Sequence, residues 1–232
     1  MHEVADGYAY GLWSMVLFNI VLFGGFIYSF AKPNTKVEWR SFGLFSSFLV
    51  ALFVEMYGFP LTIYFLTGWL GSKYPVANPF SHENGHLWGV FFHTGTGHFA
   101  WPHVLSNILI VVGALVISSG WKSVHQAKGK IAADVLYNLV SHPQYSGFIL
   151  VILGFLVQWP TILTLAMAPI LIARYVYLAK KEEKFMLEQF PIDYAKYIQG
   201  RPRFIPRISD LMKSKDELGR MGDRDQINQS KF

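Results

Sequence analysis

The sequence contains no cysteine, so neither a disulfide bond nor a thiolate metal site is possible. Charged residues are also scarce: they make up 15% of the chain, whereas soluble domains typically carry about 25%. Hydrophobic residues account for 52% of the chain and aromatic residues for 17%. This balance indicates a protein whose solvent is partly lipid, and the length of 232 residues suits one compact membrane domain.

Basic residues are missing from the first ten positions, which carry Glu3 and Asp6 instead. A secretory signal begins with a basic region, so we expect the first apolar segment to be retained as a membrane anchor. The net charge of +5 indicates basic cytoplasmic loops and contact with membrane lipids rather than with nucleic acid.

Long apolar runs divide the chain. The first has 21 residues without a charge, which as a helix crosses a hydrocarbon core of roughly 30 Å. We therefore predict an all-α polytopic membrane protein with about five transmembrane helices. These helices are predicted over Gly11–Ala31, Ser41–Gly71, Val104–Gly120, Gln144–Gln158 and Thr161–Tyr177.

Two of these runs carry internal signals. Ser41–Gly71 is too long for one straight helix, and Gly58-Phe59-Pro60 in its middle predicts a kink or a break because Pro60 lacks a backbone donor. Only Trp159-Pro160 separates the last two runs, which predicts an antiparallel helical hairpin. The run Gln144–Gln158 is short, so we expect it to start earlier or to be buried against neighbouring helices.

Basic loops alternate with nearly neutral ones. The loops at 32–40 and 121–142 are basic. The loop at 72–103 has Lys73 as its only Lys or Arg, and the turn at 158–160 carries no charge. The positive-inside rule then places the N-terminus outside and the C-terminus in the cytoplasm. We expect residues 1–206 to form one membrane-embedded domain and the polar tail 207–232 to be disordered.

Two polar clusters flank the predicted hairpin on the same, cytoplasmic side. Residues 137–147 precede it and Lys180–Lys184 follow it. Because a hairpin brings its two ends together, a pocket should assemble from Tyr137, His142, Tyr145, Glu182 and Glu183.

The sequence at and after His142 also contains residues that favour a closely packed helix. Pro143 presets the start of a helix. Gly147 and Gly154 share one helix face and would let either a flat ligand or another helix approach closely.

These residue types suit S-adenosylmethionine, which carries a sulfonium cation, an adenine ring and a ribose diol. Aromatic faces attract a sulfonium by cation–π contact, at roughly 0.5–2 kcal/mol. Carboxylates accept hydrogen bonds from ribose hydroxyls or from the amino group.

Five motifs follow one another between Tyr137 and Pro206. They are Tyr137, His142-Pro143-Gln144-Tyr145-Ser146-Gly147, Glu182-Glu183, Phe190-Pro191-Ile192-Asp193-Tyr194 and Arg201-Pro202-Arg203-Phe204-Ile205-Pro206. In this order they resemble the pattern of the isoprenylcysteine carboxyl methyltransferases and the related phospholipid methyltransferases. The chain departs from the family pattern at Ser141, where the family has Arg, and at Val135 and Pro191, where it has Gly. Lys180, Lys181 or Arg203 could take over the role of the missing Arg.

The resemblance implies that residues 131–206 bind S-adenosylmethionine and that a lipid-like or small apolar acceptor enters from the membrane. We expect this membrane to be a bacterial inner membrane. The implied cofactor contacts are Tyr137, His142, Pro143, Gln144, Tyr145, Gly147, Glu182 and Glu183. A carboxylate acceptor needs no base, whereas an amine or thiol acceptor needs one, and His142 or Glu183 could serve. Further substrate candidates are Glu55, Arg174, Lys181 and Arg203.

Two of these residues also have a simpler, structural interpretation. Glu55 is either a substrate contact or a buried, hydrogen-bonded core group near the Pro60 break. Arg174 is either a catalytic contact to a substrate carboxylate or a side chain that snorkels to the membrane interface.

Two other functions stay open. His82-Glu83-Asn84-Gly85-His86 matches the zinc-protease pattern, although Asn84-Gly85 favours a turn over the helix that this chemistry needs. A non-enzymatic membrane scaffold or sensor that retains the fold is the other alternative, and the Ser141 departure keeps it open.

Overall fold

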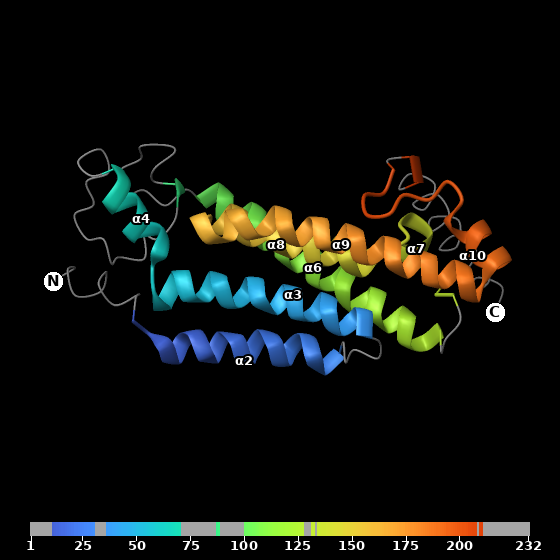
Figure 1. Ribbon diagram of the computed structural model, residues 1–232, viewed down its shortest axis with the longest axis horizontal. Coiled ribbons are helices and arrows are strands. Elements are labelled where there is room, and N and C mark those ends of the chain that lie inside the picture. The colour runs from blue at the N-terminus through green and yellow to red at the C-terminus, as the bar shows by residue number, and fades with distance from the viewer. Residues whose placement is uncertain are drawn as a thin grey trace, which may run out of the picture.

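The computed structural model describes residues 11–30, 36–70, 87–88, 100–127, 131–132, 134–207 and 209–210. Every regular element within these ranges is a helix, in agreement with the predicted fold class. Figure 1 shows the long helices lying roughly along one common axis. They are α2 (Trp13–Phe30), α3 (Lys36–Phe53), α6 (Ala100–Ala127), α8 (Pro143–Gln158) and α9 (Ile162–Gln189).

Three stretches are long and apolar enough to cross a membrane: Glu38–Gly58, Trp101–Ala127 and Ile162–Gln189. Two further apolar helices, Trp13–Gly25 and Pro143–Gln158, are shorter. Exposed apolar side chains on these helices, such as Val21, Val111 and Ile170, are what a lipid-facing surface requires. The structure thus supports a membrane protein with three full-length candidate spans.

The predicted interruption of the second apolar run is confirmed. Helix α3 ends at Phe53, a π-helical turn η1 covers Val54–Gly58, and α4 (Leu61–Leu70) begins after Pro60. The wider turn is closed by the amide of Phe59, which donates to the carbonyl of Val54 at 2.7 Å. Pro60 has no amide with which to continue the ladder, so the helix restarts beyond it.

Helix α8 is the buried centre of the bundle, and its closest partner is α6. A Cβ atom added at Gly147 would lie 2.7 Å from the carbonyl oxygen of Gly113, and one added at Gly154 would lie 3.1 Å from that of Ser106. Side chains on α8, including Phe148 and Ile152, are fully buried. This explains how a helix of only 16 residues is accommodated: neighbouring helices, rather than lipid, cover much of its surface.

The predicted hairpin is formed by α8 and α9, which are joined by Trp159, Pro160 and Thr161. Thr161 caps α9 by accepting a hydrogen bond from the amide of Thr164 at 3.1 Å, and the Thr164 hydroxyl accepts from the amide of Thr161 at the same distance. Helix α9 then extends well beyond Tyr177, where the predicted apolar run ended.

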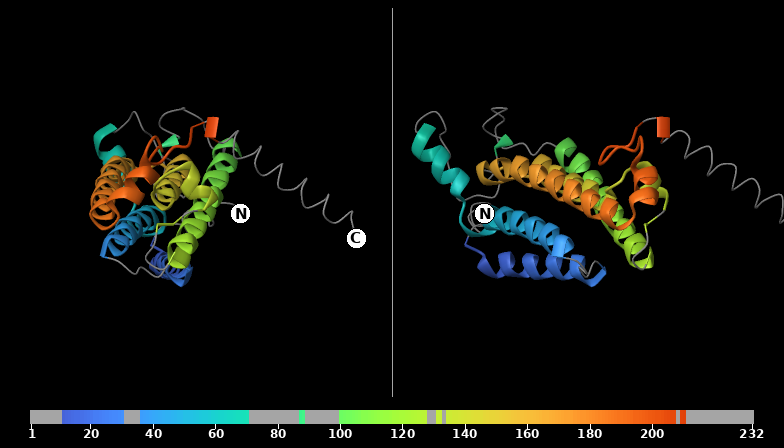
Figure 2. Two further views of the ribbon diagram at one scale, coloured as in Figure 1. Left: turned by 90° about the vertical axis from the view of Figure 1, so that its right-hand side faces the viewer. Right: turned by 45° about the vertical axis from the view of Figure 1, so that its right-hand side comes forward.

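Two short helices flank the open end of the hairpin. The short helix α7 (Val135–Leu139) precedes α8, and α10 (Pro191–Ile198) follows α9. Both lie at the same end of the molecule in Figure 1 and in the right-hand view of Figure 2. The chain after α10 turns back toward the bundle and reaches the start of α8.

Candidate functional site

The site is built around His142, the residue that precedes the first turn of α8. Pro143 occupies the first helical position, where the missing amide of proline costs nothing. The amide of His142 donates to the carbonyl of Arg203 at 3.0 Å, and the amide of Ser141 donates to that of Pro202 at 2.9 Å. The segment after α10 therefore fixes the backbone on which the imidazole is mounted.

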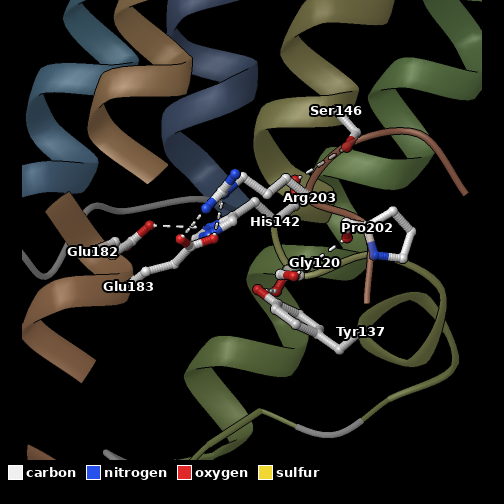
Figure 3. Close-up of polar contacts among 9 residues, drawn as sticks. Gly120, Tyr137, His142, Ser146, Glu182, Glu183, Pro202 and Arg203 are labelled. Atoms are coloured by element: carbon white, nitrogen blue, oxygen red, sulfur yellow. Dashed lines mark hydrogen bonds and ion pairs between the residues drawn. The ribbon is translucent and has the colours of Figure 1, made fainter. Parts of the chain in front are cut away.

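Both ring nitrogens of His142 face a carboxylate from α9. Nδ1 lies 3.4 Å from Oε2 of Glu182, and Nε2 lies 3.3 Å from Oε1 of Glu183 (Figure 3). The imidazole is almost fully buried, whereas Glu182 keeps about a third of its side chain exposed. The two ends of the hairpin meet as predicted, and the structure places the imidazole between the two carboxylates.

Glu183 is also bound by a guanidinium group. Arg203 Nε donates to Oε1 at 2.8 Å and Nη2 donates to Oε2 at 2.9 Å, a bidentate arrangement that lysine cannot reproduce. Of the three basic residues considered as substitutes for the missing Arg at position 141, Arg203 is the one that joins this cluster. Ser141 instead donates from its hydroxyl to the carbonyl of Pro202 at 3.3 Å.

Burial and the neighbouring charges act in opposite directions on the pKa of His142. Burial disfavours the imidazolium and is the largest single influence, but the hydrogen bonds and charges of Glu182 and Glu183 together outweigh it. The pKa of His142 is therefore raised above its usual 6.5. Burial and the nearby Glu182 also raise the pKa of Tyr137 well above its usual 10, so this phenol stays neutral.

Aromatic rings support the imidazole from the core side. The ring of Tyr145 stacks on that of His142 with centroids 5.6 Å apart, and Tyr175 stacks behind Tyr145 at the same distance. Phe204 approaches the imidazole with a centroid distance of 6.2 Å. These contacts leave His142 little rotational freedom, which keeps it aligned between the carboxylates.

A cavity of about 830 Å³ opens beside this cluster. Five of the residues assigned to the site from the sequence line it: Tyr137, His142, Gln144, Lys181 and Glu182. Others that line it were not assigned to the site, namely Lys36, Glu38, Val124, Ile131, Ala132, Ser141, Lys184, Phe185, Met186, Glu188, Gln189, Phe190, Tyr194 and Tyr197.

The sequence held a signal for some of these additional residues. Phe190 and Tyr194 belong to the motif that carries the family resemblance, and Tyr197 follows Tyr194 by three positions, on the same side of α10. Lys36 and Glu38 enter from the start of α3, about a hundred residues earlier, and nothing local marks them.

Several predicted residues support the wall of the cavity from behind. Pro143, Tyr145, Glu183 and Arg203 contact His142 or the start of α8 without lining the cavity. Gly147 requires a correction. It faces α6, where an added Cβ would lie 2.6 Å from Ile117, so of the two roles predicted for this glycine the structure assigns helix packing.

Two substrate candidates lie away from the cavity. Glu55 is completely buried in η1, where its Oε2 accepts a hydrogen bond from the amide of Thr62 at 3.1 Å. The π-turn is separated from the cavity-lining start of α3 by the length of that helix, roughly 28 Å. Of the two readings of Glu55, the structure therefore favours the buried, hydrogen-bonded core group. Arg174 is exposed on α9, with its guanidinium carbon 5.5 Å from the centroid of the Tyr177 ring.

The zinc-protease motif at His82, Glu83 and His86 lies outside the described residues. Within the described ranges, no group of three or more His, Asp or Glu side chains is arranged to hold a metal ion.

No known family model matches the chain, and no curated protein or solved structure is significantly similar to it.

Proposed function

We propose that the chain is a membrane-embedded, S-adenosylmethionine-dependent methyltransferase of the isoprenylcysteine carboxyl methyltransferase type, acting on a lipid-like or small apolar acceptor. We place it in a bacterial inner membrane, with five membrane-embedded helices and the cavity on the cytoplasmic side. The observation that carries the proposal is the position of His142, held between Glu182 and Glu183 at the wall of a large cavity.

The cavity has the chemistry that this cofactor needs. Its volume falls within the range of roughly 300–1,000 Å³ that is usual for small-molecule sites. Three lysines and three glutamates line it, a mixture that suits a ligand with both an ammonium and a carboxylate group. Its aromatic residues offer faces for a sulfonium and an adenine ring, and they are Tyr137, Phe185, Phe190, Tyr194 and Tyr197.

Glu182 is the strongest candidate for a direct cofactor contact. One of its oxygens faces His142, which leaves acceptor capacity on a half-buried carboxylate that lines the cavity. A ribose diol or an ammonium group would satisfy it. Glu183 has less capacity to spare, because it already accepts from His142 and twice from Arg203.

The same geometry favours one class of acceptor. The cofactor would supply an electrophilic methyl group, and an amine or thiol acceptor would need a base to take its proton. His142 has a raised pKa and is held by two carboxylates, and Glu183 is held by Arg203, so neither is a ready base. An ionised carboxylate needs none and would be attracted by Lys36, Lys181 and Lys184.

The test is calorimetric titration of S-adenosylmethionine into purified protein. We expect binding by the intact chain and at least a tenfold loss of affinity, about 1.4 kcal/mol, in Glu182→Ala. The matched control is Glu188→Ala, which removes the same charge from the same helix and the same cavity without touching His142. A smaller loss is expected there.

Absence of binding by the intact chain would refute the proposal and favour the scaffold alternative. Equal losses in the two variants would refute the assignment of Glu182. A screen of lipid extracts with a radiolabelled methyl donor would then identify the acceptor, with carboxylate-bearing lipids expected to be labelled first.

A further inference from the structure

The edge of the lipid-facing surface can be located on α6. Apolar side chains are exposed on this helix up to Leu115, which is 64% exposed, and the next charged residue, Lys122, is exposed two turns later. Because lipid-facing helices expose apolar side chains within the bilayer and basic ones at its boundary, the boundary lies between these two residues.

Because α6 and α8 are closely packed, the same boundary can be located on α8. An added Cβ at Gly147 would touch Ile117, and one at Gly120 would lie 3.2 Å from Gln144. The boundary between Leu115 and Lys122 is therefore level with the first turn of α8.

The chain after α10 returns to this level. The hydroxyl of Ser146, in the first turn of α8, donates to the carbonyl of Phe204 at 2.8 Å. Figures 1 and 2 show this segment turning back from α10 toward the bundle. Phe204 packs against the core, whereas its neighbour Ile205 points outward and is 81% exposed.

We propose that the turn Phe204–Arg207 is a membrane-docking turn that inserts Ile205 into the adjacent lipid leaflet. Arg207, exposed two residues later, is placed to reach the phosphate groups of the lipids, with Asp210 as the nearest described acidic residue along the chain. An isoleucine exposed at the bilayer boundary gains apolar contact there, at roughly 25 cal/mol per Å² of buried area. The inference depends on the membrane setting alone and not on the proposed methyltransferase activity.

Docking would also stabilise the candidate site, because the same segment holds it. The carbonyls of Pro202 and Arg203 accept hydrogen bonds from the amides of Ser141 and His142, and the guanidinium of Arg203 binds Glu183. Lipid contact at Ile205 therefore favours the arrangement in which Arg203 stays on Glu183.

The absence of cysteine allows a direct test, since one introduced cysteine is a unique labelling position. A spin label at Ile205→Cys is compared with one at Ile192→Cys in lipid nanodiscs. Ile192 is the matched control, because it is equally exposed at 81% but lies on α10. It follows the end of α9, some 18 Å of helix beyond the exposed Tyr177.

We expect the ratio of collision rates with oxygen and with a water-soluble nickel complex to be several-fold higher at position 205 than at 192. Equal, water-like ratios at both positions would overturn the inference. As a second measurement, Ile205→Asp should speed hydrogen exchange of the Ser141 and His142 amides in nanodiscs, whereas Ile192→Asp should not. Unchanged exchange in Ile205→Asp would overturn the link between docking and the site.

Discussion

His142 combines two properties: it is almost fully buried, and it has a carboxylate at each ring nitrogen. A neutral imidazole carries one donor and one acceptor nitrogen, so it cannot donate to both carboxylates. The imidazolium can, and the resulting cluster pairs two cations, His142 and Arg203, with two anions. Charge balance explains how four ionisable side chains are gathered beside an apolar core.

This protonation state leads to a prediction about pH. The folded-state pKa of His142 is raised, so its ion pairs contribute fully below the unfolded-state value of about 6.5 and are lost as pH rises through the folded-state pKa. We expect the thermal stability of the intact protein to fall across this interval. His142→Gln should lack this component and should be less stable at the acidic end by about 1–3 kcal/mol.

Thermal unfolding scans at a series of pH values, together with an NMR titration of the His142 ring, would measure this effect. His125→Gln is the control, since that histidine lies on α6 with its Nδ1 2.8 Å from the carbonyl of Trp121, outside the cluster. A pH-independent difference between the intact protein and His142→Gln would contradict the prediction.

At the scale of elements, the contact between α6 and α8 depends on glycine. An added Cβ at Gly147 would lie 2.6 Å from Ile117 and 2.7 Å from the carbonyl oxygen of Gly113, and backbone cannot move aside as a flexible side chain can. We expect Gly147→Ala to separate the two helices and to destabilise the fold by about 1–3 kcal/mol. Gly43→Ala on α3 is the control.

Position 43 has nothing within 4 Å of an added Cβ. Alanine there should be neutral or stabilising, by up to about 1 kcal/mol, because alanine is the better helix former. Denaturation in detergent measures both variants. If Gly147→Ala kept full stability but lost affinity for S-adenosylmethionine, the cofactor role that the sequence suggested for this glycine would be restored.

The elements were predictable where the signal is local. Pro60 marks the break after η1, and Trp159-Pro160 marks the hairpin turn, because proline and short connections restrict the backbone within a few residues. The end of α9 was missed. Hydropathy follows only the apolar part of a helix, whereas Lys180–Lys184 are good helix formers that continue it into water.

The site was predictable along the hairpin and in the motif segments that flank it. His142 and the twin acids could be placed together because an antiparallel connection fixes which residues meet. Lys36 and Glu38 could not be, because their approach depends on how α3 packs against α9, and no sequence pattern reports that packing. Glu55 stayed ambiguous for a related reason: a carboxylate in an apolar run is unusual whether it binds a substrate or, as here, the amide of Thr62.

The molecule as a whole is polarised along its long axis. One end holds the cavity, the ionic cluster and many of the basic residues, including Lys36, Arg40 and Lys122. The other end holds the hairpin turn, η1 and α4, and the described residues from Phe59 to Leu70 contain no Lys or Arg. Under the positive-inside rule, an asymmetry of this kind determines how the protein is oriented in the membrane.

The expected orientation places the cavity in the cytoplasm, and single cysteines can test it. Ala195→Cys lies on exposed α10 at the cavity end, and Phe59→Cys lies at the exposed break at the other end. With a membrane-impermeant maleimide, Ala195→Cys should react in inside-out vesicles and not in intact spheroplasts, and Phe59→Cys should show the reverse. The parent chain, which has no cysteine, gives the background. If the pattern were inverted, the cavity would face away from the cytoplasm, and the basic residues around it would have to be explained by an anionic ligand rather than by topology.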